Sequence, residues 1–289
     1  MNDRLSLASG RQTAAVQMPM KSLMFYAALA AAGVARAAHA GAADDFVDNA
    51  PQSSYFTQAP KTAVPEGSSW YTSAELGAIS TTGNTTGTSV TGKIDARQEM
   101  LNWSNEYIVS GYFKEDDVIN NDGSHTKTRS AERYSASAKA AYKLLEDGQR
   151  AFLLGSHVAD KFGAYTRYST LAFGYGTQLL KREDKTIDVE VGPGYFHGEN
   201  AAGGEESGMT VHGAAQLRWR VSPSAQFAQT VNVERGTSNM HTVAETSLST
   251  KINGTMQMKA AFSARNDTNV PVDKKNTDTQ TSLTLVYSF

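Results

Sequence analysis

The chain has 289 residues, no cysteine and a formal net charge of −2 at pH 7. Without cysteine, a disulfide framework, a zinc–thiolate site and thiol catalysis are excluded, and a slightly acidic chain is a poor match for nucleic acid, which basic surfaces bind. The mean hydropathy is negative. That value fits a soluble protein, but it also fits a membrane barrel, because only every second residue of a barrel strand faces lipid.

The first 40 residues have the order of a secretory signal. A basic stretch that ends at Lys21 precedes an apolar run over residues 23–34, and Ala38-His39-Ala40 supplies an A-x-A cleavage motif. We therefore expect residues 1–40 to be removed on export. The alternative is an N-terminal membrane anchor, although the apolar run is shorter than the ~20 residues that a membrane helix needs.

Residues 41–69 contain Pro51, Pro60 and Pro65 among small and polar residues, without periodicity, which predicts a flexible periplasmic tail. From Trp70 to Phe289, apolar and polar residues alternate in segments long enough for a tilted strand to cross a membrane. We predict an all-β, antiparallel transmembrane β-barrel of the bacterial outer membrane with twelve strands, ten or fourteen being the alternatives. The expected strands are 70–80, 88–100, 103–115, 128–143, 150–160, 165–180, 186–197, 208–222, 225–235, 241–253, 255–266 and 278–289.

The breaks between these segments alternate in length. Short breaks such as Asn253-Gly254 alternate with a set that includes the longest ones, at 116–127, 198–207 and 267–277. Short turns on one side and longer loops on the other are typical of outer-membrane barrels. With a periplasmic N-terminus, an even number of strands also returns the C-terminus to the periplasm.

Aromatic residues are predicted to form two belts on the outer wall, one near each end of the strands. Amphipathic rings prefer the two lipid–water interfaces, whereas in a soluble β-sandwich they would lie mid-strand in the core. The belt at the periplasmic ends would contain Trp70, Trp103, Tyr142, Phe152, Trp219, Tyr287 and Phe289, and the opposite belt Phe113, Tyr134, Tyr165 and Tyr195.

The last segment alternates up to the final residue. Leu283, Leu285, Tyr287 and Phe289 share one face, and mostly polar residues share the other, with Val286 as the exception. A period of two predicts a strand with one apolar face. An aromatic residue at the end of such a strand resembles the terminal strand of outer-membrane barrels, which closes the barrel and carries the assembly signal.

Three stretches resemble one family of bacterial proteins. They are Trp70 to Thr85 (with Glu75-Leu76-Gly77 and Thr82-Gly83-Asn84-Thr85), Gly192-Pro193-Gly194-Tyr195, and Val270 to Thr279 followed by the last strand. In this order they are similar to the YdiY-like outer-membrane proteins, described as salt- or acid-induced and grouped under a domain of unknown function. The resemblance covers residues 70–289. It implies an outer-membrane barrel without an assigned activity and supplies no catalytic residues.

Mid-strand charged residues fall on the face opposite the predicted lipid face. Because charge that faces lipid costs a few kcal/mol near the membrane midplane, we expect these side chains in the lumen. They are Glu75, Lys93, Asp95, Arg97, Glu99, Glu106, Lys114, Arg133, Lys139, Asp188, Glu190, Arg218, Arg220, Glu234, Glu245, Lys259 and Arg265. Such a lumen is either a polar channel whose charges select solutes or a closed interior braced by ion pairs.

A hairpin of segments 186–197 and 208–222 would bring opposite charges together. On that pairing Asp188 and Glu190 lie level with Arg220 and Arg218 and would pair with them across the strands. If the lumen conducts, we predict that Lys93, Arg97, Lys139, Asp188, Glu190, Arg218 and Arg220 line its constriction.

Residues that would support a membrane-facing lipid hydrolase are sparse. His197 is predicted to face outward with Ser169 on the neighbouring strand, His157 and His212 to point into the lumen, and no nucleophile-elbow motif is present. We therefore expect no enzyme, no cofactor and no metal site, since histidines with metal-ligand spacing are absent. The run Asn120-Asn121-Asp122-Gly123-Ser124 is similar to a calcium loop, but such runs are also typical of turns.

These features predict a narrow passive pore of the outer membrane, or an envelope protein with a stress-related role that only the resemblance implies. The alternatives are a structural barrel with a closed lumen and a membrane-facing lipid hydrolase. Expected partners are outer-membrane lipid and lipopolysaccharide, whose phosphates Lys274 and Lys275 could meet, the barrel-assembly machinery, and small polar solutes or ions.

Overall fold

The computed structural model describes residues 68–81, 86–119, 124–144, 148–270 and 276–289. The predicted signal, the predicted tail up to residue 67, residues 120–123 of the calcium-like run and the lysines at 274 and 275 lie outside these ranges. Every regular element in the described part is a strand: β1 (Ser69–Thr81), β2 (Thr86–Glu99), β3 (Trp103–Ile119), β4 (His125–Lys143), β5 (Arg150–Asp160), β6 (Tyr165–Lys181), β7 (Lys185–Asn200), β8 (Glu205–Ser222), β9 (Ala225–Arg235), β10 (Met240–Lys251), β11 (Met256–Asp267) and β12 (Thr277–Ser288).

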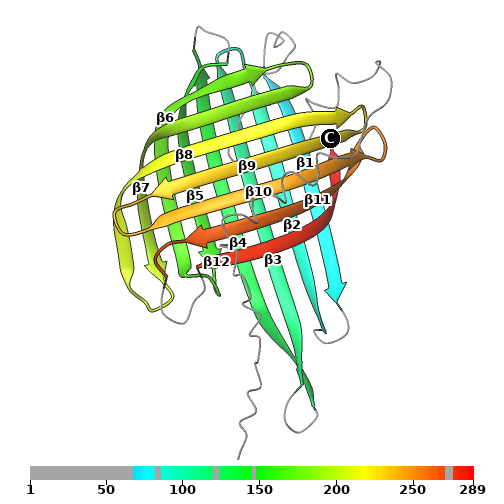
Figure 1. Cartoon of the computed structure of the whole chain (residues 1–289), viewed down its shortest axis with the longest axis vertical. Helices are drawn as coiled ribbons and strands as arrows, with labels where there is room; N and C mark the ends of the chain where they lie inside the picture. Colours follow the sequence, from blue (N-terminus) through cyan, green and yellow to red (C-terminus); the bar gives the residue numbers. More distant parts are fainter. Residues whose placement is uncertain (1–67, 82–85, 120–123, 145–147, 271–275) are drawn as a thin grey trace, which may run out of the picture. The chain divides into compact units, whose positions relative to one another are not determined.

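The twelve strands form one closed antiparallel barrel, as predicted. Each strand pairs with its neighbours in sequence, and β1 pairs with β12 to close the ring. Figure 1 shows the strands lying side by side in chain order, from cyan to red. Closure leaves no free sheet edge, which is what a sheet needs where no water can satisfy its backbone.

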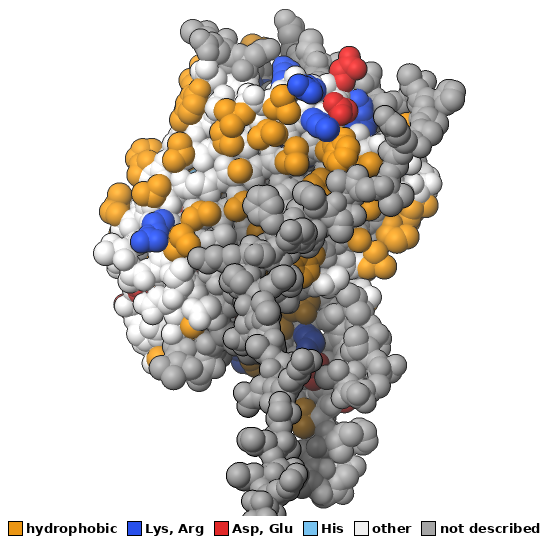
Figure 2. Space-filling view, in the orientation of Figure 1, with side chains coloured by type: hydrophobic (Ala, Val, Ile, Leu, Met, Phe, Trp, Pro, Cys, Tyr) orange, Lys and Arg blue, Asp and Glu red, His pale blue; other side chains and the backbone are white. Residues whose placement is uncertain are grey.

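Alternation along each strand separates a lipid-type exterior from a polar interior. In β12, Leu285 is 44% exposed on the outer wall, whereas the adjacent polar Thr284 is 5% exposed on the inner face. Figure 2 shows apolar side chains spread over the outer wall, with charged side chains gathered mainly near the upper rim. A wall with this much exposed apolar surface is stable only against another apolar phase, so the barrel spans a membrane.

Most of the predicted aromatic residues lie on the outer wall. Trp70, Trp103, Tyr142, Tyr287 and Phe289 at one end, and Tyr134 and Tyr195 at the other, are all at least two-fifths exposed. Trp103 packs edge-on against Tyr142, with ring centroids 5.2 Å apart, and Phe113 packs in the same way against Tyr134.

Phe152 and Tyr165 are exceptions, and their predicted outward positions are wrong. Phe152 is 4% exposed and Tyr165 7% exposed, and both side chains lie inside the barrel. Strand β5 has apolar residues on both faces, so its hydrophobic pattern does not define which face is outer. The charged Arg150 at its start lies inside the barrel, and alternation then places Phe152 inside as well. At Tyr165 a register shift between Tyr165 and Arg167 turns the ring inward.

Two of the predicted long loops are mostly strand. The β3–β4 hairpin continues to Ile119 and His125, and the β7–β8 hairpin to Asn200 and Glu205. The first ladder continues through the predicted break, where Asp117 lies opposite Lys127 and Ile119 opposite His125. The break at 267–277 agrees with the structure. We call the side of these hairpin tips the loop end and the side of residues 100–102 and 223–224 the turn end.

Candidate functional site in the barrel lumen

Buried side chains fill the lumen toward the turn end. All twelve strands contribute to this luminal plug: Ser73 and Glu75 (β1), Arg97 and Glu99 (β2), Ser104 and Glu106 (β3), Lys139 and Ala141 (β4), Arg150 and Phe152 (β5), Gly176 (β6), Asp188 and Glu190 (β7), Gln216 and Arg218 (β8), Gln226 and Thr230 (β9), Ser247 and Ser249 (β10), Gln257 and Lys259 (β11), Thr284 and Val286 (β12). In a water-filled channel these inward side chains would be exposed. Their burial closes the lumen at this level.

A five-residue ion cluster forms one side of the plug. The Glu190 carboxylate accepts from Lys139 Nζ at 2.5 Å and from Arg150 Nε at 3.0 Å. Arg150 and Arg218 also reach the two oxygens of Asp188, at 3.3 and 3.2 Å. We call these five residues the Glu190 cluster; they join β4, β5, β7 and β8.

Gly176 on β6 has no side chain, and this leaves room in the lumen for Glu190 and Arg150. A Cβ at this position would lie 2.9 Å from Glu190 Cγ and 3.0 Å from Arg150 Nε. Any larger residue would therefore displace one of the two ion-pair partners. The Lys139 ammonium also lies over the Phe152 ring, 5.0 Å from its centroid, so an aromatic face supplements the carboxylates.

A second cluster spans the barrel seam. Glu75 on β1 contacts Lys93 on β2 at 3.6 Å and Lys259 on β11 at 3.4 Å. Lys93 also contacts Asp95 at 3.4 Å, and Lys259 contacts Glu245 at 3.2 Å. Because Glu75 and Lys259 lie on either side of β12, their pair links the first strand to the penultimate one through the interior.

The predicted pairing of β7 with β8 is only partly right. Asp188 does contact Arg218, but in the ladder it lies opposite Gln216, and Thr186 lies opposite Arg218. Glu190 pairs with Lys139 and Arg150 on other strands instead of with an arginine of β8. Arg220 lies near the turn end, where it donates to the carbonyl of Glu183 at 2.5 Å. In the observed register Glu199 lies opposite Glu205, so each acid of β7 lies opposite the β8 residue four positions before the predicted arginine.

The structure therefore places the predicted pore-lining residues in four different settings. Lys139, Asp188, Glu190 and Arg218 belong to the Glu190 cluster, Lys93 belongs to the seam cluster, and Arg97 contacts Glu99 at 3.5 Å. Arg220 is separate from both clusters.

Glu106 is the least satisfied acid of the plug. It is 2% exposed, and neither carboxylate oxygen has a hydrogen-bond partner among the described residues. Its ladder neighbours are Arg97 on β2 and Lys139 on β4. Burying a carboxylate without hydrogen bonds costs free energy. The neighbouring positive charges of Arg97 and Lys139, and not hydrogen bonds, therefore offset the burial of Glu106.

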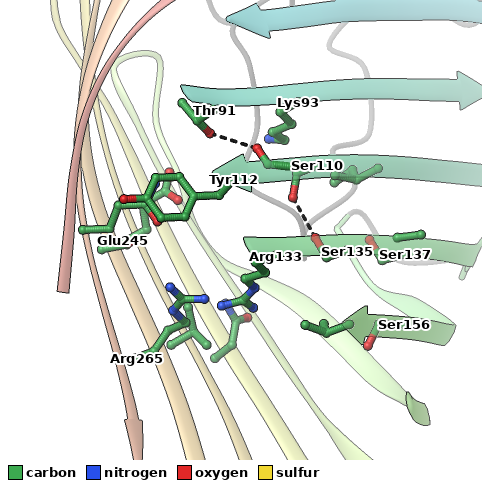
Figure 3. Close-up of a pocket in the computed structure, with 18 of the residues that line it drawn as sticks. Thr91, Lys93, Ser110, Tyr112, Arg133, Ser135, Ser137, Ser156, Glu245 and Arg265 are labelled. Atoms are coloured by element: carbon green, nitrogen blue, oxygen red, sulfur yellow. Dashed lines mark hydrogen bonds between the residues drawn. The ribbon is translucent and has the colours of Figure 1, made fainter. Parts of the chain in front are cut away.

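A cavity of about 230 Å³ lies in the lumen beyond the plug. Hydroxyl groups line much of its wall, among them Ser110 and Ser135, whose oxygens are 2.7 Å apart. Figure 3 shows Arg133 and Arg265 reaching toward each other from β4 and β11. Both guanidinium groups share the Asp160 carboxylate, at 3.8 and 3.7 Å. The cavity is polar and of mixed charge, which suits a small hydrated solute.

The outer wall carries a serine–histidine contact that differs from the predicted one. His157 faces outward, contrary to the prediction, and its Nδ1 lies 2.9 Å from Ser169 Oγ. His197 is also outward, in the ladder position opposite Ser169 on the other side. Side chains alternate between the two faces along β5, so the arrangement that places Phe152 inside the barrel also places His157 outside. His212 points into the lumen as predicted, with its Nδ1 2.5 Å from Glu234.

This contact lacks the other parts of a hydrolase site. Within the described ranges, the His157 ring has no partner but Ser169 to orient it. Ser169 also sits in a regular strand, where the ladder occupies the backbone N–H groups that an oxyanion hole would require. A serine and a base at hydrogen-bond distance need both features for efficient acyl transfer.

We expect the Ser169→Ala and His157→Ala variants to match the unmodified barrel in a phospholipid hydrolysis assay, with all three at the level of protein-free vesicles. Fatty-acid release from phosphatidylethanolamine vesicles measures this. Hydrolysis by the unmodified barrel that disappears in Ser169→Ala would contradict the expectation.

The described residues contain no group of three or more His, Asp or Glu side chains placed to hold a metal ion. In the same residues no helix is long and apolar enough to cross a membrane.

Comparison with known proteins adds a family. A family model described as "Protein of unknown function, DUF481" matches residues 74–289. The chain belongs to this family. The DUF481 chain is also 27% identical over 161 residues to "Uncharacterized protein YdiY" of Escherichia coli (strain K12), an alignment that covers 55% of this chain and 63% of that protein. The chain thus spans less than two thirds of the length of this curated relative. These matches confirm the resemblance seen in the sequence.

Comparison with solved structures finds outer-membrane proteins that are similar to the DUF481 chain at low identity. A COG4313 outer-membrane channel from Pseudomonas putida F1 has a TM-score of 0.48 at 10% identity, over 81% of this chain and 100% of that one. The translocator domain of the autotransporter NalP from Neisseria meningitidis has a TM-score of 0.43 at 14% identity, over 93% and 97% of the two chains. The NanC porin has a TM-score of 0.45 at 7% identity, over 75% and 98%.

Sequence reasoning missed Arg150, which the structure places at the centre of the Glu190 cluster of this DUF481 barrel. Its position at the first residue of β5, beside a turn, gave no reason to assign it to either face. The signal that could have found it is charge balance: Asp188 and Glu190 lie two residues apart on one face of β7 and need more than one nearby cation.

Proposed function

We propose that this chain is an outer-membrane barrel whose lumen is sealed by its own side chains, so that it serves the envelope as a closed barrel and not as an open diffusion pore. The observation that carries this proposal is the luminal plug. Buried residues from all twelve strands fill the lumen toward the turn end, and two ion clusters join strands that are not adjacent in the wall, β4 and β5 with β7 and β1 with β11.

The outer membrane is the location that fits this barrel. Alternating strands, exposed apolar side chains on the outer wall and aromatic residues near both strand ends are typical of that compartment. The predicted signal over residues 1–40 and the terminal strand with Leu283, Leu285, Tyr287 and Phe289 support export and assembly. On this proposal the partners are membrane lipid, lipopolysaccharide at the loop end and the barrel-assembly machinery. A stress-related role rests on the family resemblance alone.

A narrow passive pore is the second candidate. It is favoured by the composition of the plug, which in the described ranges consists of strand side chains, and by the cavity of about 230 Å³ that lies beside it. In that case Lys139, Asp188, Glu190 and Arg218 would form the constriction, and only their rearrangement would be needed to admit small ions.

Single-channel recording tests the choice. The mature chain is refolded, shown to be folded by its β-sheet circular dichroism and resistance to protease, and inserted in a planar bilayer at high salt. We expect no conductance steps, because the plug leaves no water-filled path. Stable, reproducible steps from the folded barrel would overturn the closed-barrel proposal in favour of the pore.

A further inference from the structure

A second cavity lies at the loop end of the lumen and combines aromatic rings with carboxylates. It has a volume of about 100 Å³, and six residues give it its character: Tyr165, Tyr168, Phe196, Glu206, Glu234 and Asp267. They come from β6, β7, β8, β9 and β11. We call it the mouth cavity. It shares Tyr168 and Glu234 with the larger cavity beside it, so the two are adjacent.

The aromatic side of the mouth cavity is a mutually packed group of three rings. Tyr165 meets Phe196 edge-on, with centroids 5.2 Å apart, and Tyr168 in a similar way at 6.2 Å. Tyr168 and Phe196 are close to parallel, with centroids 5.8 Å apart. Such packing fixes the ring orientations, and it is the inward turn of Tyr165 at the register shift that completes the group.

Hydroxyl, amide and imidazole groups hold the carboxylates of the mouth cavity. Glu206 accepts from the Tyr165 hydroxyl at 2.7 Å and from the Ser238 hydroxyl. Asp267 accepts from Asn239 Nδ2 at 2.8 Å and contacts His241 Nδ1 at 2.9 Å. Glu234 accepts from Thr210 at 3.2 Å and contacts His212. These contacts fix the positions of the carboxylates but bring no lysine or arginine charge to them.

His212 is fully buried, and its Nε2 has no hydrogen-bond partner among the described residues. The geometry therefore fits the tautomer that carries its proton on Nδ1 and donates it to Glu234.

No Lys or Arg in the described part of the chain pairs directly with the carboxylates of this site, although His241 contacts Asp267 and Arg133 acts on it over a longer distance. Of the described residues that line the mouth cavity, none is Lys or Arg, and none of the three carboxylates forms an ion pair with Lys or Arg in the described part of the chain. Elsewhere in the lumen each carboxylate cluster includes its own lysines or arginines. Here a concave site offers aromatic rings and fixed negative charge together, the combination that recognises organic cations.

We propose that the mouth cavity binds a small organic cation of the methylated-ammonium class at the loop end of the barrel. The aromatic rings would contact the methyl groups, and Glu206, Glu234 and Asp267 would supply the opposing charge. The site lies on the loop-end side of the plug, so it goes beyond the closed-barrel proposal and does not depend on whether the lumen conducts.

Calorimetric titration of the folded, detergent-solubilised barrel tests this proposal, with choline as the probe at physiological ionic strength. The comparison ligand is the uncharged isostere of choline in which carbon replaces nitrogen. We expect choline to bind and the isostere to bind at least about tenfold more weakly, because only the cation gains from the rings and carboxylates.

Three variants assign the site. Phe196→Leu removes one ring and keeps most of its volume, and Glu206→Gln removes one charge but keeps an oxygen for the Tyr165 hydroxyl; each should weaken choline binding by about tenfold. Tyr195→Leu is the matched control. Tyr195 precedes Phe196 on β7 but faces outward, so its replacement should leave binding unchanged.

The proposal is overturned if choline fails to bind the folded barrel, if the isostere binds as well as choline, or if Phe196→Leu and Glu206→Gln bind it as tightly as Tyr195→Leu does. Because binding is measured without a conductance readout, these outcomes are independent of the bilayer recording that tests the closed lumen.

Discussion

Replacing Glu190 by glutamine should lower the free energy of unfolding of the barrel by about 3–5 kcal/mol, the range found when one partner of a buried ion pair is removed. The Glu190 carboxylate is buried and binds both Lys139 and Arg150. Glutamine keeps the shape but leaves three cations of the cluster with Asp188 alone. Urea unfolding of the refolded barrel in lipid vesicles, followed by tryptophan fluorescence, measures the change.

Glu199→Gln is the matched control for this variant. Glu199 lies on the same strand, but it faces outward near the loop end, where it pairs with Arg167 at 2.6 Å. The Arg167 side chain is 67% exposed, and exposed pairs contribute at most about 1 kcal/mol. A loss in Glu190→Gln no larger than the loss in Glu199→Gln would show that the cluster does not stabilise the fold in the way its geometry indicates.

Replacing Lys139 and Glu190 together by alanine should convert a silent barrel into a conducting one. The double change removes a cation and an anion in equal number, so the lumen keeps its charge balance, and Arg150 retains its contact with Asp188. It also removes two long side chains from the plug, and Gly176, which lies beside Glu190, has no side chain of its own to fill the gap. Water entering this space would join the larger cavity to the turn end, and planar-bilayer recording would detect the resulting steps.

Arg167→Ala with Glu199→Ala is the control pair, since it deletes an ion pair from the outer wall and leaves the plug intact. This control should stay silent. If the Lys139→Ala and Glu190→Ala barrel is folded but also silent, the seal lies elsewhere in the plug, and the Glu190 cluster is a brace without a part in closure.

Strand positions and the barrel class could be predicted from the sequence because both depend on local alternation. A residue faces either lipid or the interior, and the two environments select opposite chemistry, as the outward Leu285 and the inward Thr284 of β12 illustrate. The prediction fails where that contrast disappears. In β5 the residues Phe152 and Leu153 are both apolar, so the pattern allowed either phase, and one wrong choice misplaced Phe152 and His157 together.

The candidate site was less predictable, because it depends on contacts between distant strands. The inward face of Glu190 followed from alternation, but its partners on β4 and β5 depend on register and tilt across several strands. The mouth cavity could not be foreseen at all. It requires Tyr165 inside the barrel, and the register shift that places it there interrupts the alternation on which the prediction relied.

The seam between β1 and β12 is shorter than the other ladders. It pairs residues from Ser73 opposite Ser288 to Leu76 opposite Leu285, with two further hydrogen bonds between Thr72 and Phe289, whereas β1 pairs with β2 along its whole length. The ladder with the fewest backbone hydrogen bonds is the one that separates at the lowest cost in free energy. The two hydrogen bonds of Phe289 with Thr72 are therefore a large share of the backbone bonds that close the barrel. We expect the wall to open first at this seam, and the Lys259–Glu75 ion pair to oppose that opening from inside the barrel.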